Sequence, residues 1–466
     1  MSVTFVAPKA VLPGKSEPVP ATVTVDTNTG KITDVKEGVH DASGDVVKVP
    51  ENQVLLPGLI DTHVHLNQPG RTQWEGFATG TTAAISGGVT TLIDMPLNSI
   101  PPTTTVDNLK EKQSAALDTG ISCDVGFWGG IIPGNQDDLV PLLKAGVRGF
   151  KCFLIESGVD EFPCVQEEDL DKACKALEKY DGPTPLVMFH AELDEHAHEH
   201  KNGDANGHAN GKKESNPEAY ETFLDSRPES LETAALSLIL KLCARYPSLR
   251  FHIVHLSAGS ALPALREARA KGIKNLTVET CFHYLTLSSE DIPDNATQFK
   301  CCPPIRTEAN RQLLLDAVVN GEIDYVVSDH SPCTPELKKG DFMSAWGGVS
   351  GLGLGLPLLW SEKKVRQLGL VKVVDLLSGA QAKQVRLGNK GAIEVGRDAD
   401  FAIFDPERKV EITKDGLLFR NKMSPYVGKT LDGRIEKTYL GGKLAFDADK
   451  GVTQKDGKLQ TDAGKK

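Results

Sequence analysis

The chain has 466 residues, of which 39% are hydrophobic and 25% charged, and its formal net charge is −11. This balance is typical of a globular protein with a large core, and the negative charge disfavours a nucleic-acid-binding role. No apolar run reaches the length of a membrane span, and the N-terminus lacks the basic start and apolar core of a secretory signal. Nine cysteines, an odd number without finger-like spacing, favour a reduced protein of the cytoplasm.

Residues 1–57 predict short strands separated by turns. The runs 21–25 and 46–49 have the composition of strands, and no helical period lies between them. We expect this segment to form part of a small β-sandwich domain.

Residues 58–387 alternate apolar runs with longer helical patterns, of which 230–245, 260–271 and 308–319 are examples. The first apolar run, 54–56, closes with Pro57-Gly58, and seven more lie at 90–95, 125–131, 149–153, 186–190, 251–255, 276–279 and 325–329. Eight strands alternating with helices predict an α/β fold, a parallel (β/α)8 TIM-type barrel.

Residues 388–466 return to strand-like composition. We expect them to join residues 1–57 in one composite β-sandwich domain, with a solvated, frayed tail at 452–466. A polar insert at 194–217, rich in Gly, Asn and His, predicts a surface loop. Its histidines, which could also bind adventitious metal, are His196, His198, His200 and His208.

The motif His63-Val64-His65 follows the first apolar run. Side chains at positions i and i+2 of a strand point to the same face, so two imidazoles here form a pair of nitrogen ligands for a divalent metal. For an isolated motif, two surface histidines near a turn are an equal alternative. The later runs favour the metal site, because several of them end in another ligand.

His190, His255 and Asp329 stand at the ends of three later apolar runs. Barrel enzymes carry their reactive groups where strands end and loops begin. Together with His63 and His65, these residues supply enough ligands for two metal ions, with one bridging anion still needed.

Lys151 is a lone cation within the apolar run 149–153. Lysine is rarely buried without a partner, and burial lowers the pKa of its amine. A neutral amine can add CO2 to give a carbamate, an anionic ligand with two oxygens. The alternative is an ammonium that reaches solvent or an acidic neighbour. The five other ligands favour the carbamate.

Several neighbouring polar residues allow two interpretations. His252 is out of phase with His255 and is expected to face the helices. His283 and His330 could support a ligand or face the substrate. Asp61 could accept a hydrogen bond from a ligand histidine or shape a turn.

The chain resembles the cyclic amidohydrolases of the amidohydrolase superfamily from about residue 45 to residue 445. The motifs that carry the resemblance are Pro57-Gly58-Leu59-Ile60-Asp61-Thr62-His63-Val64-His65, Gly88-Val89-Thr90-Thr91, Asp94-Met95-Pro96-Leu97-Asn98-Ser99, Gly149-Phe150-Lys151, Val327-Ser328-Asp329-His330-Ser331-Pro332-Cys333, Ala345-Trp346-Gly347-Gly348, Gly396-Arg397-Asp398-Ala399-Asp400 and Ser424-Pro425-Tyr426-Val427-Gly428. Two departures are Cys302 where relatives often carry Ser, and Phe282 where many carry Pro.

The resemblance implies a barrel with a composite β-sandwich, a homotetramer and a binuclear metal centre bridged by carboxylated Lys151. Zinc is the expected metal, and manganese, cobalt or iron would also fit. The ligands that the resemblance implies are His63, His65, Lys151, His190, His255 and Asp329.

The implied reaction is hydrolysis of a ring amide of the small molecule allantoin to allantoate, a step of purine degradation. In this hypothesis a bridging hydroxide attacks the carbonyl, and Asp329 moves the proton to the leaving nitrogen. By the resemblance, a dihydroorotase carries Arg at the position of Asn67, where it holds a ring carboxylate. Asn67 is therefore predicted to contact the neutral ureido group, because its amide offers both a donor and an acceptor. Further predicted contacts are Asn98, Arg71 and Cys302.

Three other functions remain open. A hydantoinase or dihydropyrimidinase is the first alternative, and a dihydroorotase the second. A metal-free structural relative without catalysis is the third, and the complete ligand set disfavours it.

Overall fold

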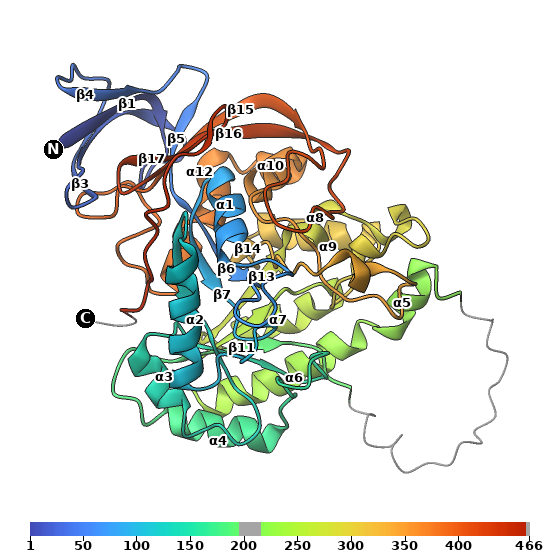
Figure 1. Ribbon diagram of the computed structural model, residues 1–466. Helices are drawn as coiled ribbons and strands as arrows, with labels where there is room; N and C mark the ends of the chain where they lie inside the picture. Colours follow the sequence, from blue (N-terminus) through green and yellow to red (C-terminus); the bar gives the residue numbers. More distant parts are fainter. Residues whose placement is uncertain (195–215, 463–466) are drawn as a thin grey trace, which may run out of the picture.

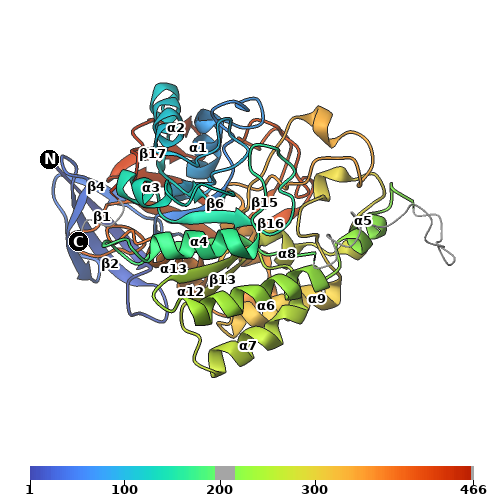
Figure 2. The same ribbon diagram turned by 90° about the horizontal axis from the view of Figure 1, so that it is seen from below.

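The computed structural model describes residues 1–194 and 216–462 (Figures 1 and 2). Most of the predicted insert, with its four histidines, lies outside the described residues.

The central part of the chain forms parallel strands that alternate with helices. One parallel sheet contains β6 (Leu59–Val64), β7 (Val89–Asp94) and β8 (Asp124–Phe127). A second has the order β14-β13-β12-β11-β10-β9, and its strands are β9 (Gly129–Gly130), β10 (Phe150–Phe153), β11 (Leu186–His190), β12 (Arg250–Val254), β13 (Leu276–Cys281) and β14 (Tyr325–Val327).

The two parallel sheets adjoin at both ends. Only Trp128 separates β8 from β9, and a parallel bridge pairs Val64, at the end of β6, with His330, which follows β14. This is the arrangement of a (β/α)8 barrel, and the predicted fold class is confirmed.

Helices cover the outside of these strands (Figure 2). Their bounds are α1 (Phe77–Ser86), α2 (Val106–Thr119), α3 (Leu139–Ala145), α4 (Glu167–Leu177), α5 (Tyr220–Ser226), α6 (Ser230–Arg245), α7 (Leu262–Ala270), α8 (Phe282–Thr286), α9 (Glu308–Val319), α10 (Gly355–Ser361), α11 (Lys363–Arg366), α12 (Leu370–Leu377) and α13 (Gly379–Gln384). Local chemistry fixes several starts: the hydroxyl oxygens of Thr105 and Thr307 accept from backbone amides in the first turns of α2 and α9.

The two ends of the chain meet in one nine-stranded sheet beside the barrel, in the upper part of Figure 1. From the N-terminal side come β1 (Ser2–Ala10), β2 (Val19–Asp26), β3 (Lys31–Glu37), β4 (Asp45–Lys48) and β5 (Val54–Pro57). From the C-terminal side come β15 (Phe401–Glu411), β16 (Thr430–Leu440), β17 (Lys443–Asp447) and β18 (Gly451–Val452). Strand β5 pairs antiparallel with β15 and so joins the two halves, as the composition predicted.

The first predicted barrel strand was placed one element too early. The run 54–56 belongs to β5 of the terminal sheet, and the barrel strand is β6, which contains His63. Gly58 separates the two strands. A larger residue would not fit there, because a Cβ would come within 2.2 Å of Thr90 Oγ1. The domain boundaries at 57/58 and 387/388 remain predictions.

The prediction of a frayed tail was wrong for residues 457–460. The amide of Val125 donates to the carbonyl of Lys458 at 3.0 Å, and the amide of Gln460 donates to the carbonyl of Val125 at 2.8 Å. These two hydrogen bonds add the tail to the edge of β8.

A buried lysine connects the terminal sheet to the barrel. The ammonium of Lys390 lies 2.7 Å from Asp124, 3.1 Å from Asp398 and 2.6 Å from Asp400. Burial alone would lower the pKa of Lys390, but the three carboxylates raise it well above its usual value. Lys390 therefore offsets part of the negative charge of this buried acidic cluster.

Replacing Lys390 with Met should lower the free energy of unfolding by about 3–5 kcal/mol, since it leaves buried carboxylates without their cation. Urea unfolding of wild type and variant measures the difference. Lys364→Met, which removes a surface ion pair to Asp316, is the control and should change stability by less than about 1 kcal/mol. A Lys390→Met protein as stable as this control would contradict the proposed role.

Candidate metal centre

The structure places all six predicted metal ligands at the carboxyl end of the barrel strands, and all six are buried. His63 lies within β6, Lys151 within β10 and His190 at the end of β11. His65 and His255 immediately follow β6 and β12, and Asp329 lies two residues after the end of β14.

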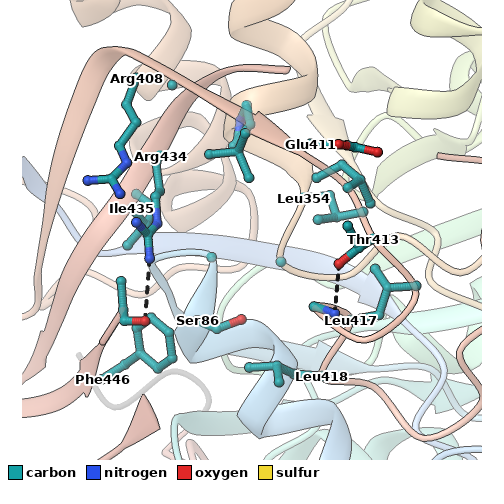
Figure 3. Close-up of a pocket in the computed structure, with 18 of the residues that line it drawn as sticks. Ser86, Leu354, Arg408, Glu411, Thr413, Leu417, Leu418, Arg434, Ile435 and Phe446 are labelled. Carbon is teal, nitrogen blue, oxygen red and sulfur yellow. Dashed lines mark hydrogen bonds between the residues drawn. The ribbon is translucent and has the colours of Figure 1, made fainter. Parts of the chain in front are cut away.

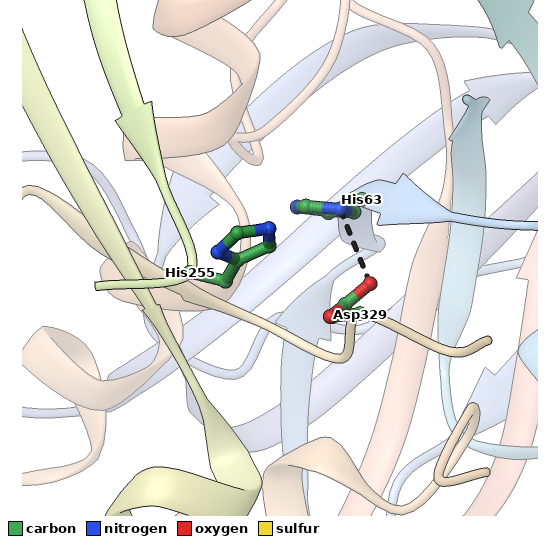
Figure 4. Close-up of side chains that lie close together, drawn as sticks. All are labelled: His63, His255 and Asp329. Atoms are coloured by element: carbon green, nitrogen blue, oxygen red, sulfur yellow. Dashed lines mark ion pairs between the residues drawn. The ribbon is translucent and has the colours of Figure 1, made fainter. Parts of the chain in front are cut away.

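The side chains converge in two groups. Asp329 Oδ1 lies 3.2 Å from His63 Nε2 and 3.5 Å from His65 Nε2. His190 Nδ1 lies 3.1 Å from His255 Nε2. The groups adjoin, because ligand atoms of His63, His255 and Asp329 lie within 4.8 Å of one another (Figure 4).

His255 and Asp329 adopt left-handed backbone conformations, each with φ of 42°. Such conformations cost free energy outside glycine and often mark functional sites. At both positions the chain turns sharply where a strand ends, and the turn aims the side chain across the barrel mouth. No sequence pattern indicated this conformation.

Glu279 is a supporting residue that the sequence analysis missed. Its Oε1 lies 2.5 Å from His63 Nδ1, and its Oε2 lies 3.1 Å from His252 Nε2. A hydrogen bond at Nδ1 leaves Nε2 of His63 available to a metal. The signal in the sequence was a charged residue in an otherwise apolar run, as for Lys151.

His252 does not face the helices, so that prediction was wrong. Its ring is buried between strands, where it contacts Glu279 and lies 2.9 Å from the hydroxyl of Tyr325. Both faces of β12 are buried, so the alternation of side chains along this strand did not reveal which face carries the hydrogen-bond partners of His252.

Burial and charge set the protonation of the ligands. Burial, followed by the charge of Lys151, lowers the pKa of His190 and His255 well below its usual value, which favours neutral imidazoles. Burial would raise the pKa of Asp329, but His63 and His65 hold it well below its usual range. Neutral imidazoles and an ionised carboxylate are the protonation states that bind divalent cations.

Lys151 has the properties that a carbamate requires. Burial lowers its pKa to about 8, although Asp329 and Glu279 partly oppose the shift. A substantial fraction of the amine is therefore neutral near pH 8. The same side chain lines the cavity together with His65, His190, His255 and Asp329.

The donor set fits a pair of divalent ions. His63 Nε2 is buried and makes no hydrogen bond with any described residue, although it faces Asp329. Four imidazoles, one carboxylate and one basic amine at this spacing match the preferences of zinc and related metals.

Two of the remaining candidate residues, Asp61 and His330, have polar partners within the protein. Asp61 accepts from the backbone amides of His63 and Ser328, so it shapes a turn and does not hold an imidazole. His330 Nε2 lies 3.2 Å from Glu75 Oε2. His283 is buried, and neither ring nitrogen forms a hydrogen bond within residues 1–194 and 216–462.

Two of the four predicted substrate contacts line the cavity beside the ligands, which has a volume of about 220 Å³. These two are Asn98 and Cys302. Asn67 and Arg71 are not among the lining residues: Asn67 is buried and donates to the carbonyl of Pro332 at 3.3 Å, while Arg71 pairs with Glu161.

A larger hollow of about 570 Å³ lies between the β15–β16 hairpin and the end of α1 (Figure 3). Its walls include Leu354, Leu417, Ile435 and Phe446. None of the three clusters of metal-ligating side chains found in the described residues lies there. The smaller cavity is therefore the candidate active site, because predicted metal ligands line it.

Known structures share this architecture. An L-hydantoinase (dihydropyrimidinase) from Arthrobacter aurescens superposes with a TM-score of 0.86, covering 98% of this chain and 99% of its own at 23% identity. At that identity the likeness supports the fold.

Curated relatives are closer in sequence. An allantoinase of Saccharomyces cerevisiae is 48% identical over 450 residues, which are 93% of this chain and 94% of that protein. A mitochondrial allantoinase of Aquarana catesbeiana is 49% identical over 363 residues, covering 77% of this chain and 71% of that protein.

The profile of the amidohydrolase family matches residues 54–445, from the last N-terminal strand of the composite sheet through the barrel to β17. The chain belongs to the amidohydrolase family.

Proposed function

We propose that this protein is an allantoinase, which hydrolyses a ring amide of allantoin to give allantoate. The observation that carries the proposal is the convergence of four buried histidines, Lys151 and Asp329 beside a small cavity. The identity of 48% to a curated allantoinase over most of the chain supports this substrate over other cyclic amides.

In the proposed mechanism, His63, His65 and Asp329 would hold one divalent ion, and His190 and His255 would hold a second. Carboxylated Lys151 would bind both. Bound divalent ions at such a site polarise a carbonyl group and lower the pKa of water.

No membrane-spanning helix is present among the described residues.

Asp329 is the proposed proton carrier. Its carboxylate is held ionised, so it can accept a proton from the attacking water at one oxygen. It then donates that proton to the ring nitrogen as the amide bond breaks. The same residue serves as base and acid, and the proton balance closes within one turnover.

Recognition of a neutral substrate is consistent with the charges that line the cavity. Arg227 pairs with Glu192, and the ammonium of Lys300 donates to the carbonyls of Met343 and Ala345. Both cations thus have partners within the protein. The side chains of Asn98 and Cys302 are the proposed polar contacts to the ring and its ureido group.

Asn67 enters the proposal as a residue that shapes the substrate loop. Its backbone has φ of 62°, a conformation that Asn tolerates better than most side chains. Its hydrogen bond to Pro332 ties the loop after β6 to the loop after β14. Arg71 supports the same loop through the carbonyl of Asn98, at 2.9 Å.

Zinc as the metal, a homotetramer and a cytoplasmic location complete the proposal, and they are supported by the family resemblance and the reduced cysteines. All nine cysteines are described, and none forms a disulfide. Elemental analysis and light scattering of the purified protein test the first two. Fractionation of the source cells tests the third.

Lys151→Ala should abolish activity and the binding of one or both metal ions, since it removes the proposed bridging ligand. Acetate or propionate added to the variant should restore part of the activity by supplying a carboxylate. The measurements are kcat and metal content, with the exposed Lys144→Ala as control. A Lys151→Ala enzyme with wild-type turnover and no added acid would refute the bridge.

Asp329→Asn should lower kcat by about 10²–10⁴-fold, because the amide cannot carry the proton. Steady-state kinetics and metal content should be compared with those of Asp316→Asn, which changes an exposed carboxylate of α9. If Asp329→Asn keeps kcat within a few-fold of wild type, Asp329 is not the proton carrier.

A substrate panel tests the choice of allantoin. Allantoin should exceed hydantoin, dihydrouracil and dihydroorotate in kcat/KM by at least about tenfold, which corresponds to about 1.4 kcal/mol of transition-state binding. The same metal-loaded preparation must be used throughout. A larger kcat/KM for any of the other three compounds would overturn the assignment.

A further inference from the structure

The ring of His190 is held by a carboxylate that the proposed reaction does not use. Glu192, two residues further along the chain, is completely buried, and its Oε2 lies 2.6 Å from His190 Nε2. If Nε2 carries the proton, Nδ1 is left with a lone pair. That nitrogen is the one that lies 3.1 Å from His255 Nε2, so the hydrogen bond points the lone pair at the candidate metal position.

Two contacts restrain the imidazole plane. The ring of Phe153 stacks on it with a centroid distance of 4.5 Å and an interplanar angle of 11°. Stacking fixes the plane of the ring but does not distinguish its two nitrogens. The carboxylate of Glu192 supplies that distinction.

A buried carboxylate needs a countercharge, and Arg227 provides it. Its Nη1 lies 2.5 Å from the same Oε2 of Glu192 that faces His190. Arg227 caps the end of α5, and its backbone amide donates to the carbonyl of Leu224 at 3.1 Å. The backbone of Arg227 is thus fixed at a helix end. Among the described residues, Glu192 has no ion-pair partner other than Arg227 and His190.

A second buried ion pair lies nearby and makes different contacts. Arg306 lies 2.7 Å from Glu232, whose Oε1 accepts from the amides of Ser257 and Ala258 in the loop after His255. The pair of Arg306 and Glu232 therefore fixes the backbone of this loop. The pair of Arg227 and Glu192 instead holds an imidazole ring, and Arg227 also lines the cavity.

We propose that Arg227 is a positioning residue for the metal centre, which acts through Glu192 to fix the tautomer and orientation of His190. The inference rests on the metal-binding part of the proposed function. It does not depend on which cyclic amide is the substrate. Because the guanidinium lies at the cavity wall, with 23% of its side chain exposed, it also links the substrate cavity to a metal ligand.

The test is the metal affinity of the full-length protein, measured with zinc by competition against a chelator. The visible absorption spectrum of the cobalt-loaded protein is the second measurement, because it reports ligand geometry without turnover. Arg227→Met should lower the affinity by about 10–100-fold and change the cobalt spectrum. Arg227→Lys, which can still place a charge beside Glu192, should lose less. The control is Arg245→Met, which removes an exposed arginine of α6 and should bind metal like wild type.

The double variant Arg227→Met/Glu192→Gln separates this mechanism from a general loss of stability. If Arg227 acts through Glu192, the double variant should lose no more affinity than the more impaired single variant. Should Arg227→Met fail to fold, Glu192→Gln and Arg227→Lys carry the test, and Glu192→Gln must show the changed cobalt spectrum.

Wild-type affinity and spectrum in Arg227→Met, an unchanged spectrum in Glu192→Gln, or additive losses in the double variant would each overturn the inference. A protein that shows the predicted metal effects but does not turn over allantoin would retain this role for Arg227 and reject the proposed substrate. A wild-type protein that binds no metal would reject both.

Discussion

The structure of the candidate metal site depends on the compensation of buried charge. The fold removes charged and polar side chains from water at the mouth of the barrel, and their charges must be balanced there. Lys151, Asp329 and four imidazoles are buried within a small volume, where an unpaired charge is costly. The protein keeps His190 and His255 neutral and Asp329 ionised, and it lowers the pKa of Lys151 to about 8. Basic nitrogens and an anionic oxygen that face one another in this way form a site that a cation would stabilise. These buried polar groups would destabilise a hydrophobic core, whereas they are suited to binding a metal ion.

Buried carboxylates orient two of the candidate ligand histidines. Glu279 holds His63 from behind, and Glu192 holds His190. These residues come from different strands or from the loops that follow them, so the arrangement of the parallel strands is what brings them together. The composite sheet contributes indirectly, because Lys390 and the tail at 457–460 fasten the ends of the chain to the barrel.

Much of this organisation could be predicted from the sequence, for identifiable reasons. The helices expected at 230–245 and 308–319 coincide with α6 and α9, since each has a clear apolar period and defined ends. The candidate metal ligands were visible because polar residues within apolar runs or at their ends are rare. Other features were not visible. The run 54–56 resembles a barrel strand by composition, and only its pairing with β15 assigns it to the terminal sheet. The supporting roles of Glu279 and Arg227 depend on contacts between segments that are distant in the sequence. The burial of Asn67 in the loop after β6 has no sequence signature.

The central claim is that Lys151 is the carboxylated bridge of a two-metal site, and it can be observed directly. The purified protein should be loaded with zinc in the presence of ¹³C-labelled bicarbonate and examined by ¹³C NMR. The account predicts a carbamate carbon resonance, bound in a ratio of about one per two metal ions, that disappears when the metal is removed. A fully active, two-metal preparation without any carbamate resonance would contradict it.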